Sequence, residues 1–370
     1  MAERQPSKLH VASSNLVSRS TDSPAAPPTA PERLAAAGRH LRTTTAAIVR
    51  VDSELRDAAA ALSERYRSGP VPGAIRPVRD ARTATAYAVA RAPATFAAAG
   101  RAMLEAALSL PDLAPATLLD IGAGTGAAAW AATAVWPSLA DVTLVERDPA
   151  MVSMGRTLAG GRDVPSALAG ASWRTASLGR APFEPADVVT AAYVLGELPV
   201  TEAASVVQRA WAATRGALVI VEPGSPAGFA RVIAARTTLI AQGAAIAAPC
   251  PGNLPCPVVG ADWCHFLVRL ERSRAHQAAK AGTLAWEDEP FSYVVATRLA
   301  PAAAPRVVLG RPRHRPGRVE LRVCVAAGRI VERTLSRRDG AEFRAARDLA
   351  WGDRIPAPLV ERVDPTPRRR

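Results

Sequence analysis

The apolar positions of the chain change their period along its length, and each period predicts a different kind of element. Over 32–67 and again over about 78–110, alanine, leucine and arginine recur at helical spacing, and Pro93 predicts a kink in the second stretch. The turn sequence "SGPVPG" at 68–73 separates the two. Ser, Pro and Thr dominate 1–31, which cannot build a core. We expect a disordered tail, 1–31, followed by a helical N-terminal region, 32–110.

Short apolar runs alternate with longer amphipathic stretches between 111 and 248. The runs predict strands at 116–121, 141–146, 187–193 and 216–222, with a further strand in "SWRTAS". The stretches between them predict helices at 126–136, 148–159, 200–213 and 225–245. This alternation predicts an α/β fold whose parallel sheet is covered by helices on both faces.

The alternation stops after Ala248. A proline-rich loop with cysteines runs to Cys264, a polar helix is expected over 265–281, and short strands are expected over about 290–336. We divide this part into a cysteine-rich segment with its following helix or strand, 249–300, and a basic C-terminal β unit with a tail, 301–370.

Charge is distributed unevenly over a chain that is 49% hydrophobic and carries a net charge of +13. Residues 301–370 hold 17 arginines against 8 acidic residues, whereas 101–300 hold 15 basic against 17 acidic residues. Basic ends around a near-neutral body favour contact with a polyanion such as RNA, although composition bias alone could produce the excess of arginine. There is no apolar run of membrane-spanning length and no secretory signal, so we expect a soluble protein inside the cell.

The sequence "LLDIGAGTG" predicts a nucleotide-like cofactor site. Asp120 lies near the end of a strand, and Gly122, Gly124 and Gly126 form the turn before a helix, where a ligand must approach the backbone closely. Glu146 ends the next strand, where a carboxylate can accept hydrogen bonds from both ribose hydroxyls. The spacing also fits a dinucleotide, but the acidic residue before the glycines is typical of S-adenosylmethionine sites.

Further pocket residues are expected at the ends of neighbouring strands. Tyr193, Leu195 and Glu197 follow the strand at 187–193, and their side chains are candidates to face cofactor or substrate; for Leu195 simple packing is an equal alternative. Ser177 is expected near the adenine. No N-P-P-Y or D-P-P-Y sequence and no cysteine lies in the sheet portion, so the methyl acceptor stays open.

All four cysteines belong to one candidate metal-binding set: Cys250, Cys256, Cys264 and Cys324. Zinc sites favour closer C-x2-4-C pairs, and the long proline-rich gaps suit a loop around a larger iron–sulfur cluster. Zinc and unligated thiols remain alternatives. His265 could replace one ligand, although a surface or outer role is expected, and Trp263 and Phe266 are expected to shield the site or simply to pack.

The segments "PCPGNLPCPVVGADWCHF", "EDEPFSYV", "VLGRPRHRPGRVELRVC" and "AARDLAWGD" resemble the ribosomal small-subunit methyltransferase-like family over about 32–355. That resemblance implies a Rossmann-like class I methyltransferase fold with a cysteine-rich metal-binding insert. It implies a four-iron four-sulfur cluster on the four cysteines, and it carries the cofactor turn onto Asp120, Gly122, Gly124 and Gly126. It also implies rRNA of the small ribosomal subunit as the partner.

The resulting hypothesis is an S-adenosylmethionine-dependent rRNA methyltransferase-like protein, monomeric and ribosome-associated in a bacterial cytoplasm. The alternatives are a non-catalytic small-subunit assembly factor that binds rRNA, and a small-molecule methyltransferase. The cluster is expected to act in structure or redox sensing, because methyl transfer requires no electrons. The acidic run Glu287, Asp288 and Glu289 is expected to be a solvated turn.

Overall fold

The computed structural model describes residues 27–68, 80–302 and 306–355, with the side chains of 65–68 left undescribed. The expected tail at 1–31 and the turn at 68–73 therefore lie mostly outside the described residues. The helices are α1 (Ala30–Ile48), α2 (Ser53–Ser68), α3 (Ala81–Ala90), α4 (Ala92–Ser109), α5 (Ala127–Val135), α6 (Pro149–Ala159), α7 (Ser166–Ala169), α8 (Val200–Ala213), α9 (Pro226–Ala241), α10 (Arg274–Ala279) and α11 (Gly340–Arg347), with 3-10 turns η1 (Leu195–Glu197) and η2 (Arg337–Asp339).

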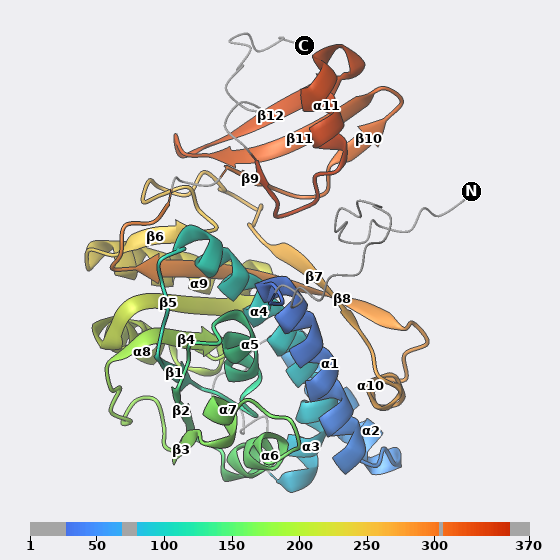
Figure 1. Cartoon of the computed structure of the whole chain (residues 1–370), viewed down its shortest axis with the longest axis vertical. Coiled ribbons are helices and arrows are strands. Elements are labelled where there is room, and N and C mark those ends of the chain that lie inside the picture. Colours follow the sequence, from blue (N-terminus) through green and yellow to red (C-terminus); the bar gives the residue numbers. More distant parts are fainter. Residues whose placement is uncertain (1–26, 69–79, 303–305, 356–370) are drawn as a thin grey trace, which may run out of the picture.

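Two sheets organise the described residues (Figure 1). The larger contains β1 (Thr117–Ile121), β2 (Asp141–Glu146), β3 (Ser172–Thr175), β4 (Ala186–Ala192), β5 (Thr214–Pro223), β6 (Ala245–Ala248), β7 (Phe266–Glu271) and β8 (Trp286–Thr297). The smaller contains β9 (Arg306–Val308), β10 (Arg313–Arg315), β11 (Arg318–Val325), β12 (Arg329–Ser336) and β13 (Arg354–Ile355).

The larger sheet has the order β3-β2-β1-β4-β5-β8-β6, and β7 extends β8 as a hairpin. The first five strands are parallel, but β8 runs antiparallel to both β5 and β6. The parallel sheet expected for the βα stretch is therefore confirmed for β1–β5, and β8, from further along the chain, makes the complete sheet mixed. A mixed sheet with this order is the methyltransferase-like α/β arrangement that the glycine turn suggested.

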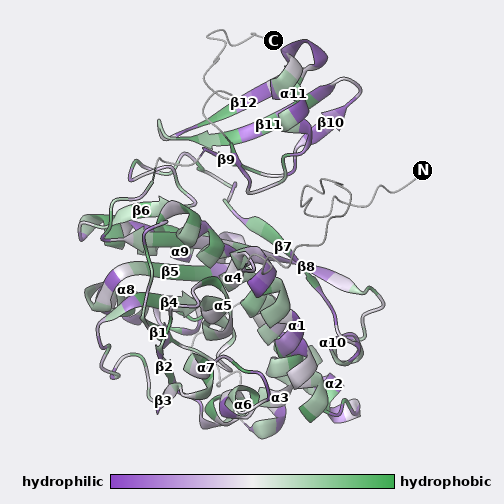
Figure 2. Ribbon diagram, in the orientation of Figure 1, coloured by the Kyte–Doolittle hydropathy of each residue, from purple (hydrophilic) through white to green (hydrophobic). Residues whose placement is uncertain are grey.

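Alternating strand residues bury the sheet on both faces. Leu118, Val188 and Val219 pack with α1–α5, whereas Leu119, Val189 and Leu218 pack with α8 and α9. Successive side chains of a strand point to opposite faces, so runs apolar at every position need helices on both sides. In Figure 2 these strands are hydrophobic, while hydrophilic residues gather on β10 and α11.

The element boundaries predicted from the first half of the chain are largely confirmed. The 32–67 stretch is two helices, and the 78–110 stretch breaks between α3 and α4 at Arg91, two residues before Pro93. The predicted helix at 225–245 ends at Ala241, because a turn with Gly243 at φ 81° follows and leads into β6. The predicted helix at 265–281 is wrong: β7 occupies 266–271, and only the short α10 follows.

The C-terminal unit has a core of its own. Val319, Leu321 and Val323 of β11 pack with Phe343 and Ala346 of α11. This unit is joined to the main body at β13, where Arg354 Nε lies 2.6 Å from Glu105 Oε2 on α4 and Arg354 Nη2 donates to Ser109 Oγ at 2.7 Å. In Figure 1 it lies beyond the β6 end of the large sheet. No described helix is long and apolar enough to cross a membrane.

Candidate functional site

The turn after β1 can be built only with glycine. Gly122, Gly124 and Gly126 have φ of 69°, 58° and 82°, the left-handed region that residues with a Cβ rarely adopt. A Cβ on Gly122 would lie 2.2 Å from Val194 Cγ2. Gly126 is the N-cap of α5, so the turn directs backbone N–H groups and a helix N-terminus toward the carboxyl end of the sheet.

Glu146 holds this turn in place from the end of β2. Its Oε2 accepts the Gly124 N–H at 2.8 Å, and its Oε1 accepts the Asp148 N–H at 2.9 Å. Burial raises the pKa of Glu146, and the two backbone N–H groups oppose that rise. The carboxylate therefore orders the cofactor turn itself, and its remaining acceptor positions are those a ribose would use.

Five of the predicted cofactor residues meet at one pocket: Gly122, Gly124, Glu146, Ser177 and Tyr193. The pocket is also lined by groups that the sequence did not single out: Tyr87, Arg147, Asp148, Met151 and Glu202. Glu197, a candidate from the sequence, lies there too, and Arg147 Nη2 reaches its Oε2 at 3.0 Å. With four carboxylates against one arginine, the pocket favours a cationic ligand, and a sulfonium is one.

Three predicted residues do not line the pocket. Gly126 lies one step further along the turn. Leu195 is 2% exposed in the core shared with α8 and α9, so its packing alternative describes what the structure shows. Asp120 is fully buried under the turn, where its Oδ1 accepts the Thr190 hydroxyl at 2.6 Å. Burial raises the pKa of Asp120 to about 7.

The raised pKa of Asp120 predicts a pH-dependent cost to stability. Between about pH 4 and pH 7 the unfolded chain releases this proton while the folded chain keeps it, so the contribution of Asp120 to stability falls as pH rises. Asp120→Asn has no such proton and still offers Oδ1 to Thr190. We expect the variant to gain stability relative to wild type across this window, measured by urea unfolding at both ends. An unchanged difference would contradict the raised pKa.

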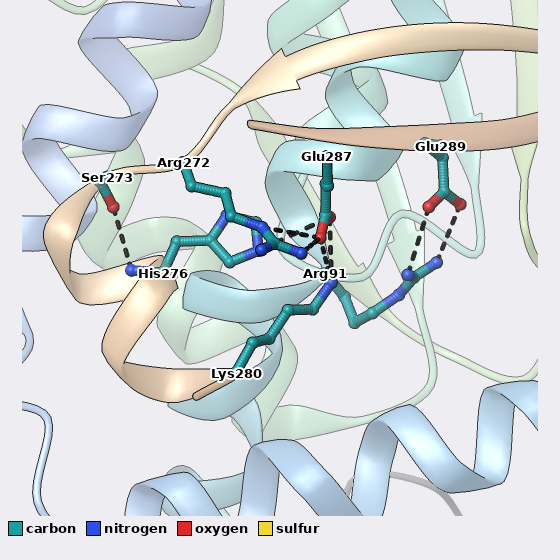
Figure 3. Close-up of polar contacts among 7 residues, drawn as sticks. All are labelled: Arg91, Arg272, Ser273, His276, Lys280, Glu287 and Glu289. Atoms are coloured by element: carbon teal, nitrogen blue, oxygen red, sulfur yellow. Dashed lines mark hydrogen bonds and ion pairs between the residues drawn. The ribbon is translucent and has the colours of Figure 1, made fainter. Parts of the chain in front are cut away.

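Tyr193 connects the pocket to buried charges on β8. It is a non-glycine residue with φ of 59°, a strained backbone conformation that often occurs at functional sites. Its hydroxyl donates to Glu289 Oε1 at 3.0 Å, and Arg91 Nη2 lies 3.1 Å from the same oxygen. Figure 3 shows Arg91 reaching Glu289 from the junction of α3 and α4. The end of β4 is thus tied to Glu289 of β8 and, through Glu289, to Arg91 at the junction of α3 and α4.

The acidic run is not a solvated turn, and that expectation is wrong. Glu287 lies in β8 and receives Arg272 at 2.6 Å and Lys280 at 2.8 Å, with the His276 ring 3.6 Å away (Figure 3). Asp288 pairs with Arg269 at 2.7 Å. Burial lowers the pKa of His276 to about 4, so its ring is neutral at pH 7. No local pattern could have found these pairs, because each cation comes from another element.

The four cysteine side chains come together. Cys250 follows β6, Cys256 and Cys264 lie in the loop before β7, and Cys324 comes from β11 of the C-terminal unit; all four line one cavity. Phe266 lines the same cavity, whereas Trp263 points its Nε1 to the Gly224 carbonyl.

His265 is held outside the cavity that the cysteines line. Its ring stacks on Trp263 with 5.2 Å between centroids, and the edge of Trp351 meets it at 4.6 Å. This placement is that of a packing residue and not of a ligand that replaces one of the cysteines.

The four thiols line one cavity but do not form a preformed ion site. Within the described ranges, no group of three or more His, Cys, Asp or Glu side chains is placed to hold a metal ion. Burial raises the pKa of Cys324 to about 12, and burial with the neighbouring thiols raises that of Cys264 well above its usual value. Four thiols are soft donors that suit zinc or an iron–sulfur cluster, and a bound metal would favour their deprotonated forms.

Comparison with known proteins gives one family and one close relative. Residues 81–356 match the family described as mitochondrial small ribosomal subunit Rsm22. The chain is 34% identical over 295 residues to the human protein named ribosome assembly protein METTL17, mitochondrial. That alignment covers 73% of this chain and 62% of the human protein, so the chain spans less than two thirds of that relative.

Solved structures with similar folds are distant in sequence. Magnesium protoporphyrin IX methyltransferase from Synechocystis PCC 6803, with bound SAM, is 13% identical to this chain, with a TM-score of 0.35. The match covers 68% of this chain and 99% of that one. An O-methyltransferase family protein from Burkholderia thailandensis is 14% identical with a TM-score of 0.38, over 60% and 61%. Neither similarity bears on the substrate.

Proposed function

The chain belongs to the mitochondrial small ribosomal subunit Rsm22 family, and from that membership we propose an S-adenosylmethionine-binding, methyltransferase-like protein of small-subunit assembly. The observation that carries the cofactor part is the glycine turn tied to Glu146 beside an acidic pocket. The ribosomal part rests on the family and on the human relative, whose name describes ribosome assembly.

The pocket residues have separable roles in this proposal. Gly122 and Gly124 let a nucleoside approach the backbone, Glu146 accepts its ribose hydroxyls, and Ser177 lies at the adenine end. Tyr87, which packs against Gly124, and Tyr193 also line the pocket. Bound S-adenosylmethionine would supply a methyl group on a cationic sulfur, and the acidic lining favours that charge.

We also propose that Cys250, Cys256, Cys264 and Cys324 hold a four-iron four-sulfur cluster. The support is the cavity that all four line and the preference of iron–sulfur centres for four thiolate ligands. Such a cluster would cross-link the loop before β7 to β11, and so hold the C-terminal unit on the main body. Its chemistry in this proposal is structural or redox-sensing.

The C-terminal sheet offers a surface for rRNA. Arg313, Arg315 and Arg318 are exposed, and the pairing of β10 with β11 sets Arg315 opposite Arg318 and Arg313 opposite Glu320. Paired residues share one face of an antiparallel sheet, so these arginines form a row on the face that also carries Cys324. A row of guanidinium groups suits phosphates.

Neutralising that row should weaken rRNA binding and its dependence on salt. In Arg313→Gln/Arg315→Gln/Arg318→Gln, each lost phosphate contact should reduce the slope of log affinity against log salt by about 0.7–0.9. The measurement is a titration of a 16S-type rRNA fragment at several salt concentrations. Arg156, Arg162 and Arg180, exposed on the main body, form the matched control triple. An equal effect of both triples would refute the surface assignment.

Catalysis and assembly without catalysis are separable in cells. Mass spectrometry of small-subunit rRNA from a deletion strain should lack a methyl mark if the protein is an rRNA methyltransferase. An unchanged modification map with immature particles would instead support a non-catalytic assembly factor; the human relative's name describes ribosome assembly. Absence of any salt-dependent rRNA binding would favour a small-molecule methyltransferase. A ribosome-associated, cytoplasmic location is part of the proposal.

A further inference from the structure

Arg236 is a buried cation beside the four thiols. It lies on α9, 5% exposed, and its side chain lines the same cavity as Cys250, Cys256, Cys264 and Cys324. Among the described residues that line this cavity, the guanidinium is the one positive charge. Arginine is seldom buried without partners, so its position needs a reason.

Part of that reason is the loop that carries the cysteines. Arg236 Nη2 donates to the Gly252 carbonyl at 2.8 Å and to the Leu254 carbonyl at 2.7 Å, and these residues lie between Cys250 and Cys256. These two hydrogen bonds, donated by one nitrogen, fix the curvature of the loop around the cavity. They leave the charge itself unneutralised, because both acceptors are uncharged.

One nitrogen of the guanidinium is unsatisfied. Arg236 Nε is buried and has no hydrogen-bond partner in the described part of the chain. A buried N–H without an acceptor costs free energy, and a charged one costs more. An anionic acceptor in the cavity would remove that cost. Cys250, which lines the same cavity as Arg236, is a candidate end of such an acceptor.

We propose that Arg236 is the positioning residue of the thiol-bound centre: its Nε–H donates to a thiolate or sulfide sulfur, and its charge offsets the negative charge of that centre. This inference rests on the cluster put forward under the proposed function. Four thiolates around an iron–sulfur core leave a net negative charge, which a buried guanidinium stabilises through a charge-assisted hydrogen bond.

The test compares Arg236→Gln and Arg236→Lys with wild type in anaerobically purified full chain. Iron and acid-labile sulfide per chain, the rate of iron release to a chelator and the midpoint potential are measured. Arg298→Gln is the matched control, because Arg298 also donates to two backbone carbonyls, of Thr214 and Trp211, and does not line the cavity. Near-ultraviolet circular dichroism checks that each variant is folded.

In Arg236→Gln we expect iron release to be about tenfold faster, the equivalent of one charge-assisted hydrogen bond, and a more negative midpoint potential. Arg236→Lys keeps the positive charge but loses the planar guanidinium group with its several N–H donors. The rate of iron release should therefore rise, while the midpoint potential stays near that of wild type. Arg298→Gln should match wild type in both. Should Arg236→Gln retain the wild-type release rate and potential, or Arg298→Gln change them equally, the inference is overturned.

Wild-type chain without iron and sulfide would overturn the cluster, and this inference with it, whereas the rRNA titration tests the ribosomal role separately.

Discussion

Cys324→Ser is expected to remove most of the iron from the protein and to loosen its C-terminal unit. Cys324 is the one thiol that comes from β11, while the other three lie between β6 and β7. Loss of a ligand should cost more than loss of an outer partner, which itself lowers metal affinity about 10–100-fold. Iron per chain, by elemental analysis after anaerobic purification, should fall about tenfold or more. Backbone hydrogen exchange in β11 and β12 should quicken.

The control for this variant is Arg318→Ser on the same strand, six residues away and outside the cavity. It shortens an exposed side chain and should leave iron and hydrogen exchange unchanged. Unchanged iron in Cys324→Ser would mean that the fourth thiol holds no metal. Loss of iron without faster exchange would mean that the contacts of Arg354 with Glu105 and Ser109 hold the unit by themselves.

Glu146→Ala is expected to weaken the binding of S-adenosylmethionine strongly. The change removes the acceptor of the Gly124 and Asp148 N–H groups, leaving two buried donors unsatisfied and the glycine turn unsupported. It also removes the carboxylate proposed to bind the ribose. With a cost of about 1–3 kcal/mol for each unsatisfied buried group, affinity measured by isothermal titration should fall about 100-fold.

Glu184→Ala is the matched control for that experiment. Glu184 is a glutamate too, but it is exposed, pairs with Arg174 at 2.7 Å and lies away from the pocket. It should bind the cofactor as wild type does. Wild-type affinity in Glu146→Ala would exclude this pocket as the cofactor site, even if the protein still binds rRNA.

The βα half of the fold could be predicted because its signals are local. The strands at 141–146 and 187–193 were placed within one residue, and Gly122, Gly124 and Gly126 were assigned to a turn that does require positive φ. In a chain of this length, apolar runs between amphipathic helices indicate few folds other than an α/β fold. The glycine spacing likewise reports a backbone conformation directly.

The second half was harder because its elements depend on distant partners. Phe266–Glu271 was expected to be helical, yet it forms a strand whose residues pair from Phe266↔Phe291 to Glu271↔Trp286. Glu287 and Glu289 were expected to lie in a solvated turn, but their cations come from the two ends of α10, at Arg272 and Lys280, and from the junction of α3 and α4. A short strand without a local partner cannot be told from a helix by periodicity alone.

The amino-acid sequence by itself determined the α/β class, the glycine turn with Glu146, and the identity of the four thiols, because each depends on residue type and short spacing. Only the tertiary structure decided that β8 enters the large sheet antiparallel, that Tyr193 is tied to Glu289, and that Arg236 faces the cysteines. Those facts depend on the closure of long loops and on charges buried in pairs. Such contacts join residues tens to hundreds of positions apart, and the chain must fold before they exist.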